Sequence, residues 1–138
     1  MDRKRLAHEY GLVVRRDGGV DALERLGDGP LTVINEFQLR EVAEYTDGDT
    51  CAGVDAMLRY GASSGDCLEA VGGRFIAQAL PTGAVWGESN GEWDLVVVAE
   101  YPNVEAFWAL LDNPRYREAF VHRRAAVARQ RVTVGATM

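Results

Sequence analysis

The chain has 138 residues, a length that suits one domain and leaves no room for a second independent core. Hydrophobic residues make up 47% of it and charged residues 26%, which argues against disordered, collagen-like and fibrous proteins. Asp and Glu outnumber Lys and Arg by 21 to 15, and the net charge of −6 argues against non-specific binding to nucleic acid or to an anionic membrane. We therefore expect one folded domain whose partners include neither nucleic acid nor membrane.

The N-terminal segment predicts a short helical arm. Two helical patterns, around Asp2 to Tyr10 and Val20 to Leu26, are separated by the turn signal Asp17-Gly18-Gly19. No apolar run has the length of a signal peptide, and none approaches the roughly 20 apolar residues of a membrane-spanning helix. We expect a cytoplasmic protein with an arm at residues 1–29 and one domain at residues 30–138.

Alternating polarity from Leu31 onwards predicts a half-buried strand. One face of this strand carries Val33, Asn35, Phe37 and Leu39, and the other carries Thr32, Ile34, Glu36, Gln38 and Arg40. After a polar loop, Gly53 to Val71 predicts a helix, with one face formed by Val54, Met57, Leu58, Gly61, Gly65 and Leu68. We interpret Gly61 and Gly65 as positions where this helix packs closely on a sheet.

Two further strands are predicted after the helix stop at Gly72-Gly73. The strand from Arg74 to Leu80 has Phe75, Ala77 and Ala79 on one face and Ile76, Gln78 and Leu80 on the other. Asn90-Gly91 predicts a two-residue hairpin into a strand from Trp93 to Tyr101. Because that strand is apolar on both faces, we expect it in the middle of the sheet.

Two helices and a strand complete the predicted domain. Asn103 is placed to cap a helix whose apolar stripe contains Val104, Phe107, Trp108 and Leu111. Asn113-Pro114 then predicts a new helix that ends at about Ala128, and Arg131 to Ala136 alternates as a final strand.

The predicted order of strand, helix, strand, strand, helix, strand is typical of the ferredoxin-like α+β fold. This βαββαβ arrangement has a four-stranded antiparallel sheet with both helices on one face. The other face carries too many Val and Ala side chains for contact with water, so it needs a partner. A second copy of the chain is the simplest partner, and we expect a homodimer.

Four segments resemble a known family, namely Asp28–Tyr45, Tyr60–Arg74, Trp93–Pro102 and Asn113–Ala126. Together they are similar to the dimeric α/β-barrel proteins catalogued as domain of unknown function 1330. The resemblance implies two sheets that face each other and enclose a barrel, as in cofactor-free monooxygenases, muconolactone isomerases and haem-binding relatives of chlorite dismutase. It implies no particular reaction, because relatives on this fold perform different chemistry. Glu36 and Gln38 depart from the leucine-rich first strand usual in such proteins.

The cysteines and histidines predict neither a disulfide nor a metal site. Cys51 and Cys67 are sixteen residues apart along the predicted helical region, which corresponds to roughly 24 Å in a helix. A zinc site needs about four converging ligands, and the only histidines are His8 and His122. We expect ordinary thiols, with a redox role as the alternative, and no cofactor.

The last helix carries an unusual positive charge. Residues 114–131 contain six Arg and one Glu, a balance of +5. Arg117 and Arg124 point away from the apolar stripe of this helix, but Arg123 lies in the middle of it. The other members of the stripe are Tyr116, Ala119, Phe120 and Val127.

Two interpretations of Arg123 stay open. It either extends to the edge of the core and pairs with a carboxylate such as Glu100 or Asp94, or binds a carboxylate or phosphate of a ligand inside the barrel. Asn35, on the apolar face of its strand, is expected to satisfy nearby backbone groups.

Other side chains are candidates for catalysis or binding. His122 is the default general acid or base, with a solvated histidine as the alternative. Glu36 is a second catalytic candidate and Gln38 a ligand-binding one, provided that their face lines the barrel; otherwise Glu36 pairs with an Arg across the strands or across the dimer. Three aromatic residues are expected either to contact a ligand or to lie in the core: Tyr101, Trp108 and Tyr116.

The sequence therefore leaves several functions open. One is a cofactor-free small-molecule enzyme, similar to an oxygenase or an isomerase, and another is a non-catalytic binding or sensing module that uses the same cavity. A purely structural role is a third. Haem binding is disfavoured, because His122 on an outer helix is badly placed to reach the inside of a barrel.

Overall fold

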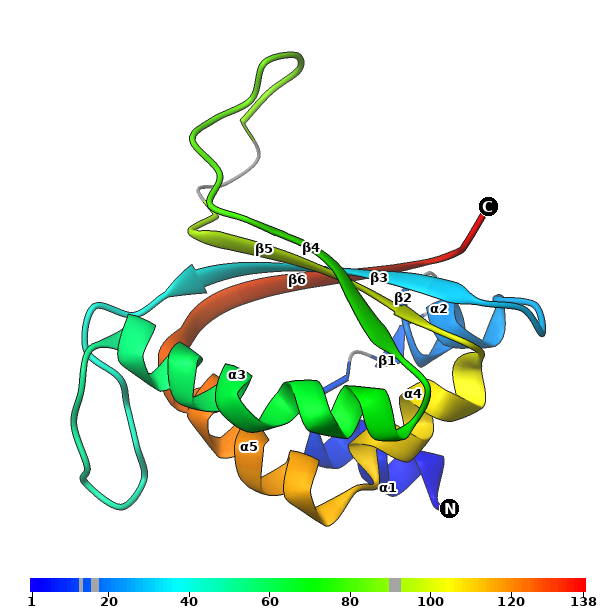
Figure 1. The fold of residues 1–138 in the computed structure, drawn as a ribbon, viewed down its shortest axis with the longest axis horizontal. Coiled ribbons are helices and arrows are strands. Elements are labelled where there is room, and N and C mark those ends of the chain that lie inside the picture. Colours follow the sequence, from blue (N-terminus) through cyan, green and yellow to red (C-terminus); the bar gives the residue numbers. More distant parts are fainter. Residues whose placement is uncertain (13, 16–17, 90–92) are drawn as a thin grey trace.

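A four-stranded antiparallel sheet organises this computed structural model, which describes residues 1–12, 14–15, 18–89 and 93–138. The strands lie in the order β4-β5-β3-β6, with bounds β4 Arg74–Ala79, β5 Leu95–Tyr101, β3 Leu31–Leu39 and β6 Val127–Ala136. One face of the sheet is covered by α3 (Gly53–Ala70), α4 (Val104–Leu111) and α5 (Pro114–Ala126), as Figure 1 shows. This is the ferredoxin-like βαββαβ arrangement, with the second helix in two pieces, so the predicted α+β fold is confirmed.

The helix ends follow from local side-chain chemistry. Asn103 Oδ1 accepts a hydrogen bond from the Ala106 backbone N–H at 2.8 Å, and Asn113 Oδ1 accepts one from the Arg115 N–H at 2.9 Å. Pro114, which has no N–H to donate, occupies the first turn of α5. At the other end of α3, Gly72 adopts a φ of 83°, which other residues rarely adopt, and so terminates the helix as predicted.

The strand register determines which side chains of the sheet face the helices. Asn35 lies between Val97 of β5 and Val132 of β6, so these three side chains share one face. Val33 and Phe37 are buried on that same face, whereas Ile34 is 38% exposed on the other. The predicted alternation of the first strand is confirmed, and we call the two sides the inner and the outer face of the sheet.

Strand β4 departs from the predicted alternation. Phe75 pairs with Ala99, but the next described pair is Ala77 with Val98, so a bulge at Ile76 shifts the register. After the bulge Gln78 pairs with Val97 and therefore shares the inner face with Phe75. The prediction that Gln78 lies opposite Phe75 is wrong, because one extra residue reverses the faces of the strand beyond it.

Helix α3 buries only part of the predicted face, namely Met57 and Leu68. Val54 and Leu58 are 54% and 67% exposed, whereas the buried positions are Gly53, Ala56, Met57, Ser64, Cys67 and Leu68. A Cβ atom at Gly61 would meet no atom within 4 Å, and one at Gly65 would make only an ordinary contact with Phe75, so the close packing expected at these glycines is wrong. The helix is rotated so that its Val54, Leu58 and Gly61 side borders an open space.

The junction between α5 and β6 lies earlier than predicted. The helix ends at Ala126 instead of about Ala128, and β6 begins at once with Val127. The strand starts early because β6 pairs along the whole of β3, from Leu31 opposite Ala136 to Leu39 opposite Val127. The predicted Asn90-Gly91 turn lies outside the described residues. Figure 1 shows the connection between β4 and β5 projecting from the sheet.

The N-terminal segment packs on the helical side of the domain (Figure 1). It contains α1 (Arg3–Glu9), the short strands β1 (Val14–Arg15) and β2 (Gly18–Gly19), and α2 (Val20–Glu24). Leu6, Tyr10 and Leu23 belong to the same buried cluster as Trp108 and Leu111. The segment therefore shares the core of the domain, and a domain boundary after residue 29 stays a prediction. In the part of the chain that is described, no helix combines the length and hydropathy needed to span a membrane.

Candidate functional site

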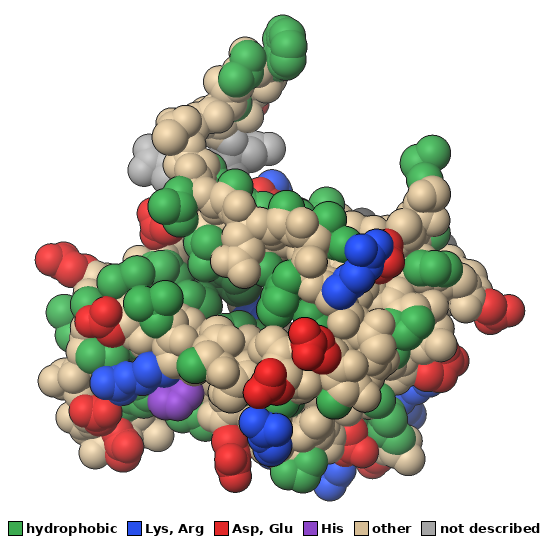
Figure 2. Space-filling model, in the orientation of Figure 1, with side chains coloured by type: hydrophobic (Ala, Val, Ile, Leu, Met, Phe, Trp, Pro, Cys, Tyr) green, Lys and Arg blue, Asp and Glu red, His purple; other side chains and the backbone are tan. Residues whose placement is uncertain are grey.

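An open cavity of about 1520 Å³ lies between the inner face of the sheet and the helices. Inner-face residues of β3 and β5, including Asn35 and Val97, form one wall, and α3 and α5 form the other. Hydrophobic side chains gather around the gap between the sheet and α3 in Figure 2. Apolar side chains form the larger part of the wall, and the charged side chains on it include Arg40, Glu41, Asp94 and Arg131 besides Arg123. A concave, largely apolar site with placed polar groups is typical of small-molecule binding.

Arg123 is a buried cation on the wall of this cavity. The residue is only 8% exposed, which confirms its predicted position on the apolar stripe of α5. Its Nη2 and Nε donate to Gln130 Oε1 at 2.8 and 3.2 Å, and its Nη1 donates to the Tyr60 hydroxyl at 3.3 Å. The guanidinium also lies over the ring of Phe37, with its carbon 4.7 Å from the ring centroid.

No carboxylate neutralises Arg123 within the described residues. The predicted pairing with Glu100 or Asp94 is wrong, because Glu100 pairs with Arg74 and Asp94 Oδ2 accepts a hydrogen bond from the Leu39 N–H. Burial lowers the pKa of Arg123, but the tyrosines around it outweigh this effect and hold the pKa above its ordinary value. The cavity wall therefore carries a charged guanidinium whose described hydrogen-bond partners are Gln130 and Tyr60.

Two tyrosine hydroxyls meet beside Arg123. The oxygens of Tyr60 on α3 and Tyr116 on α5 are 2.7 Å apart. Burial, followed by the neighbouring Tyr60, raises the pKa of Tyr116 well above its usual range. Burial also raises the pKa of Tyr101 on the cavity wall. Tyr101 and Tyr116 are therefore neutral near pH 7 and do not neutralise the guanidinium.

His122 lies outside the cavity lining. Its Nδ1 is 2.7 Å from the hydroxyl of Tyr45, which also accepts a hydrogen bond from Arg59 at 3.3 Å. His122 belongs to α5, Tyr45 to the loop before α3 and Arg59 to α3. Their contacts therefore join the two helices at their outer side. The structure thus separates His122 from Arg123, although the two are adjacent in the sequence.

Glu36 and Gln38 lie on the outer face of the sheet. Glu36 Oε1 accepts a hydrogen bond from Arg131 Nε at 2.8 Å, which is the cross-strand pairing that we gave as the alternative to catalysis. Gln38 pairs with Arg129 of β6 on the same face. Neither residue lines the cavity, so the two catalytic candidates His122 and Glu36 lie on opposite sides of the sheet.

The three aromatic candidates are divided between cavity and core. Tyr101 and Tyr116 line the cavity, whereas Trp108 is 1% exposed and does not. Arg3 of α1 lies over the Trp108 ring, with its guanidinium carbon 5.5 Å from the centroid. Trp108 therefore belongs to the core on the far side of α4. Asn35 donates to the Val97 carbonyl at 3.1 Å, as expected of a polar residue on the apolar face.

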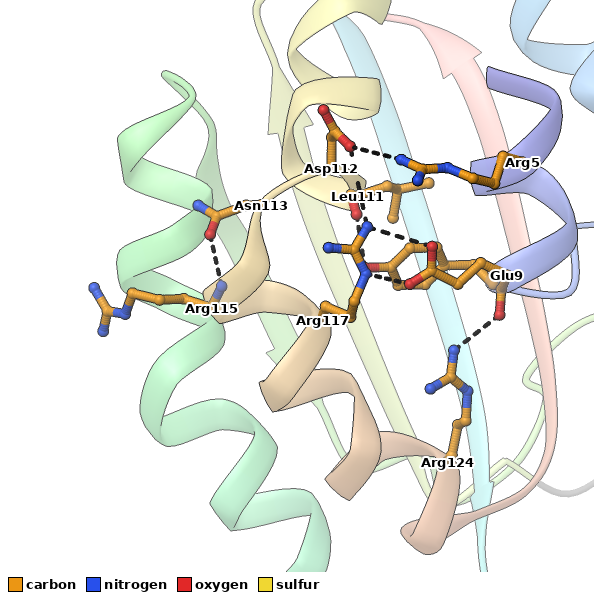
Figure 3. A network of polar contacts seen from close by, with 9 residues as sticks. Arg5, Glu9, Leu111, Asp112, Asn113, Arg115, Arg117 and Arg124 are labelled. Atoms are coloured by element: carbon orange, nitrogen blue, oxygen red, sulfur yellow. Dashed lines mark hydrogen bonds and ion pairs between the residues drawn. The ribbon is translucent and has the colours of Figure 1, made fainter. Parts of the chain in front are cut away.

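Arg117 and Arg124 point away from the cavity, as predicted, but both hold α1 (Figure 3). Arg117 forms an ion pair with Glu9, which lowers the pKa of this carboxyl, and Arg124 Nη2 donates to the Glu9 carbonyl at 2.9 Å. The three neighbouring arginines of α5 thus serve two regions, with Arg123 facing the cavity and the others facing the N-terminal helix.

Several polar residues of the cavity escaped the sequence analysis, among them Tyr60, Ser64 and Gln130. Tyr60 and Ser64 are four residues apart and lie on the helical face that also contains Met57 and Leu68. The four-residue spacing of Tyr60 and Ser64 is visible in the sequence, but the predicted apolar face of this helix contained Gly61 and Gly65 instead of these two residues. Gln130 carries no signal, because only the turn from α5 into β6 brings it back to Arg123.

The cysteines and acidic residues form no obvious reactive cluster in the described part of the chain. Cys51 lies just before α3 and Cys67 is buried within it, and both thiols are free. Among the residues that the structure describes, no three His, Cys, Asp or Glu side chains converge as a metal-binding group.

Fold and cavity together define a ferredoxin-like α+β protein with an open cavity between sheet and helices. The chain belongs to the family described as domain of unknown function DUF1330, whose model matches residues 50–137. No curated protein matches the chain. The matched segment runs from the start of α3 to the end of β6 and contains Tyr60, Ser64 and Arg123.

Solved structures share this fold. A protein of unknown function from Rhodopseudomonas palustris, RPA0582, is 34% identical and has a TM-score of 0.78, with 86% of this chain and 90% of that chain covered. SnoaB, a cofactor-independent oxygenase from Streptomyces nogalater, is 14% identical with a TM-score of 0.53, and the match covers 80% of this chain and 94% of SnoaB. The second similarity concerns the fold alone.

Proposed function

We propose that this protein binds a small apolar or aromatic carboxylic acid in the cavity between the sheet and the helices. The observation that carries the proposal is Arg123, a buried guanidinium on the cavity wall with no carboxylate partner among the described residues. A buried cation is costly unless an anion accompanies it. A ligand carboxylate would supply this anion.

The donors around Arg123 suit such a ligand. The described hydrogen bonds use three of the five N–H groups of a guanidinium, which leaves two for a carboxylate. Phe37, Tyr60 and Phe120 surround the guanidinium at 4.7, 5.6 and 5.0 Å from their ring centroids, so an aromatic body would lie against similar surfaces.

Benzoate and its neutral isostere benzamide test the proposal. We expect benzoate to bind more tightly than benzamide in isothermal titration calorimetry, and Arg123→Met to weaken benzoate binding at least about tenfold, because a charge-assisted hydrogen bond is lost. The variant should lose no more than about 1 kcal/mol of stability, since methionine fills a similar apolar volume without a buried charge.

Arg115→Ala is the matched control. Arg115 belongs to the same helix, but its side chain is 66% exposed and forms only a 3.9 Å contact with Asp66. This variant should bind benzoate like the wild type. Equal affinities for benzoate and benzamide, or unchanged benzoate binding in Arg123→Met, would refute the proposed site.

A cofactor-free enzyme, similar to an oxygenase or an isomerase, is the second candidate. It is supported by the charge of Arg123 beside the hydroxyls of Tyr60 and Tyr116, an arrangement suited to stabilising an oxyanion formed from a phenolic substrate. Oxygen uptake with 1,4-dihydroxynaphthalene tests it, since each quinone formed consumes one O2 and yields one H2O2. If the protein is an oxygen-dependent enzyme of this kind, uptake should exceed the protein-free rate and fall in Arg123→Met; a rate equal to the protein-free rate would contradict the oxygen-dependent form of this candidate.

We also propose that the protein is a cytoplasmic homodimer. The outer face of the sheet carries Ile34 with two pairs of opposite charge, Glu36 with Arg131 and Glu100 with Arg74, so it is suited to meet its own copy. Free thiols at both cysteines suit a reducing compartment.

A further inference from the structure

Asn35 presents an amide to the cavity from the sheet. Its side chain is half-buried on the inner face of β3 and lines the cavity. The Nδ2 group donates to the Val97 carbonyl at 3.1 Å. Because a carbonyl accepts hydrogen bonds and cannot donate them, this contact fixes which end of the amide is nitrogen. The other end, Oδ1, accepts no hydrogen bond from any residue that the structure describes.

The Asn35 oxygen is also accessible. Among the described residues, the buried side-chain atoms that are both sealed from solvent and without a hydrogen bond are Ser64 Oγ and Trp93 Nε1. Asn35 Oδ1 is not one of them, so it keeps accessible surface, and on the inner face this surface meets the cavity. The neighbours of Asn35 across the strands, Val97 and Val132, have no side-chain donor. The oxygen is thus available to a molecule in the cavity.

The strand register places Asn35 one step along the sheet from the Arg123 guanidinium. Arg123 lies over the ring of Phe37, 4.7 Å from its centroid, and donates to Gln130 at 2.8 Å. Phe37 and Gln130 are paired across β3 and β6, and the next pair on the inner face is Asn35 with Val132. Residues two apart in a strand are separated by about 7 Å. A substituted aromatic ring can span this spacing between the cation and the amide.

An aromatic ligand in the cavity displaces water from the Asn35 oxygen. A ligand without a donor at this place leaves the oxygen unpaired, which costs free energy, whereas a ligand hydroxyl restores the hydrogen bond. We propose that Asn35 is the second polar anchor of the cavity, and that the ligand is an aromatic acid with a ring hydroxyl remote from its carboxylate. This inference rests on the proposed function of Arg123.

The test compares 3- and 4-hydroxybenzoate with benzoate by isothermal titration calorimetry. In the wild type, the better hydroxybenzoate should bind about fivefold more tightly than benzoate, the gain of one neutral hydrogen bond. In Asn35→Val this preference should disappear, while benzoate itself should bind at least as tightly as to the wild type, because no amide oxygen is left unpaired beside it. Valine favours strands and suits this apolar face, so the variant should melt near the wild-type temperature.

Gln38→Val is the matched control. It removes an amide from the same strand, but Gln38 lies on the outer face and outside the cavity lining. This variant should keep the wild-type preference for the hydroxybenzoate.

Asn35→Asp tests the spacing from Arg123 by a second route. This variant keeps an oxygen that can accept the ligand hydroxyl, but adds a negative charge about 7 Å from the position of the guanidinium. Benzoate and the hydroxybenzoate should both bind at least about threefold more weakly at pH 7, because the new charge opposes the ligand carboxylate. Unchanged benzoate affinity would contradict the placement of Asn35 beside Arg123 and overturn the inference.

The two proposals fail in different ways. If benzoate binds in an Arg123-dependent manner but neither hydroxybenzoate is preferred, or the preference persists in Asn35→Val, the role of Asn35 is wrong and the carboxylate site stands. If benzoate binding does not depend on Arg123, the proposed function is wrong and the inference on Asn35 falls with it.

Discussion

The polar residues beside the cavity form a chain with Tyr60 at its centre. The Tyr60 hydroxyl contacts Tyr116 on one side and Arg123 on the other, at 2.7 and 3.3 Å. Tyr116 is 4% exposed and has no other described hydrogen bond, whereas Tyr60 has two partners. The two hydroxyls share one hydrogen bond, but only the Tyr60 hydroxyl would keep a described partner if that bond were lost.

Tyr60→Phe should destabilise the protein more than Tyr116→Phe. The first change leaves the buried Tyr116 hydroxyl unpaired, which costs about 1 to 3 kcal/mol, and it removes a partner of Arg123. The second leaves the Tyr60 hydroxyl with Arg123 and costs about 0.5 to 1.5 kcal/mol. Urea denaturation of both variants measures the difference.

The double variant is the control for this pair. Because no orphaned hydroxyl remains, Tyr60→Phe combined with Tyr116→Phe should cost less than the sum of the single changes. Additive losses, or a larger loss for Tyr116→Phe, would show that the hydroxyls are not coupled in this way.

Helix α1 is fastened to the corner between α4 and α5, as Figure 3 shows. The hydroxyl of Tyr10, just after the helix, donates to the Leu111 carbonyl at 2.7 Å, and Glu9 pairs with Arg117. Burial raises the pKa of Tyr10 to about 12. The N-terminal segment is therefore an integral part of the packing, with a buried acid that ionises only at high pH.

Alkaline titration should weaken the folded state through Tyr10. A group whose pKa is raised on folding contributes stability that is complete below its unfolded value near 10 and is lost as the pH rises towards 12. Tyr10→Phe should reduce the fall in the free energy of unfolding between pH 10 and 12 by on the order of 2 kcal/mol. Urea denaturation across this range measures the slope.

The variant Glu9→Gln distinguishes the contribution of the Glu9–Arg117 ion pair to stability from the effect of Tyr10 ionisation. This variant loses the ion pair with Arg117 and should lower stability at neutral pH. It should keep most of the wild-type fall above pH 10, because burial, and not the charge of Glu9, is the largest cause of the raised Tyr10 pKa. An unchanged slope in Tyr10→Phe would mean that the Tyr10 hydroxyl is not responsible.

At the scale of the whole molecule, two exposed apolar surfaces have no partner among the residues that the structure describes. Ile34 is 38% exposed on the outer face of the sheet. Leu80, Val85 and Trp86, in the connection that projects from the sheet in Figure 1, are 76%, 85% and 91% exposed. The first surface lies on the outer face of the sheet, away from the helices, and the second extends beyond the edge of the sheet. A second copy of the chain bound to this side would cover both.

Light scattering at micromolar concentration should therefore give the mass of a dimer, with an interface of at least about 800 Å² per subunit. Ile34→Glu should shift the protein to monomer without unfolding it, because the side chain is already partly exposed. Val121→Glu introduces the same charge on the exposed side of α5 and should leave the dimer intact. A wild-type monomer would contradict both the dimer and the barrel.

The sequence alone determined the order of strands and helices from β3 onwards, the helix caps at Asn103 and Asn113 and the inner face of β3, because each depends on local spacing or on a nearest-neighbour hydrogen bond. It did not predict the short strands β1 and β2 of the N-terminal segment. The same locality explains why Arg123 was found on an apolar stripe. Its partners were not found, because Gln130 returns to it through the turn into β6 and Tyr60 reaches it from another helix.

The tertiary structure alone decided which candidates share a site. A bulge at Ile76 reversed the faces of β4, and a rotation of α3 brought Ser64 to the cavity and left Leu58 exposed. Glu36 and His122 lie on opposite sides of the sheet. The sequence could not show this, because only tertiary packing decides whether a strand face and a helix face meet in one site. Local patterns specify each element, but the contents of a cavity depend on how distant elements meet.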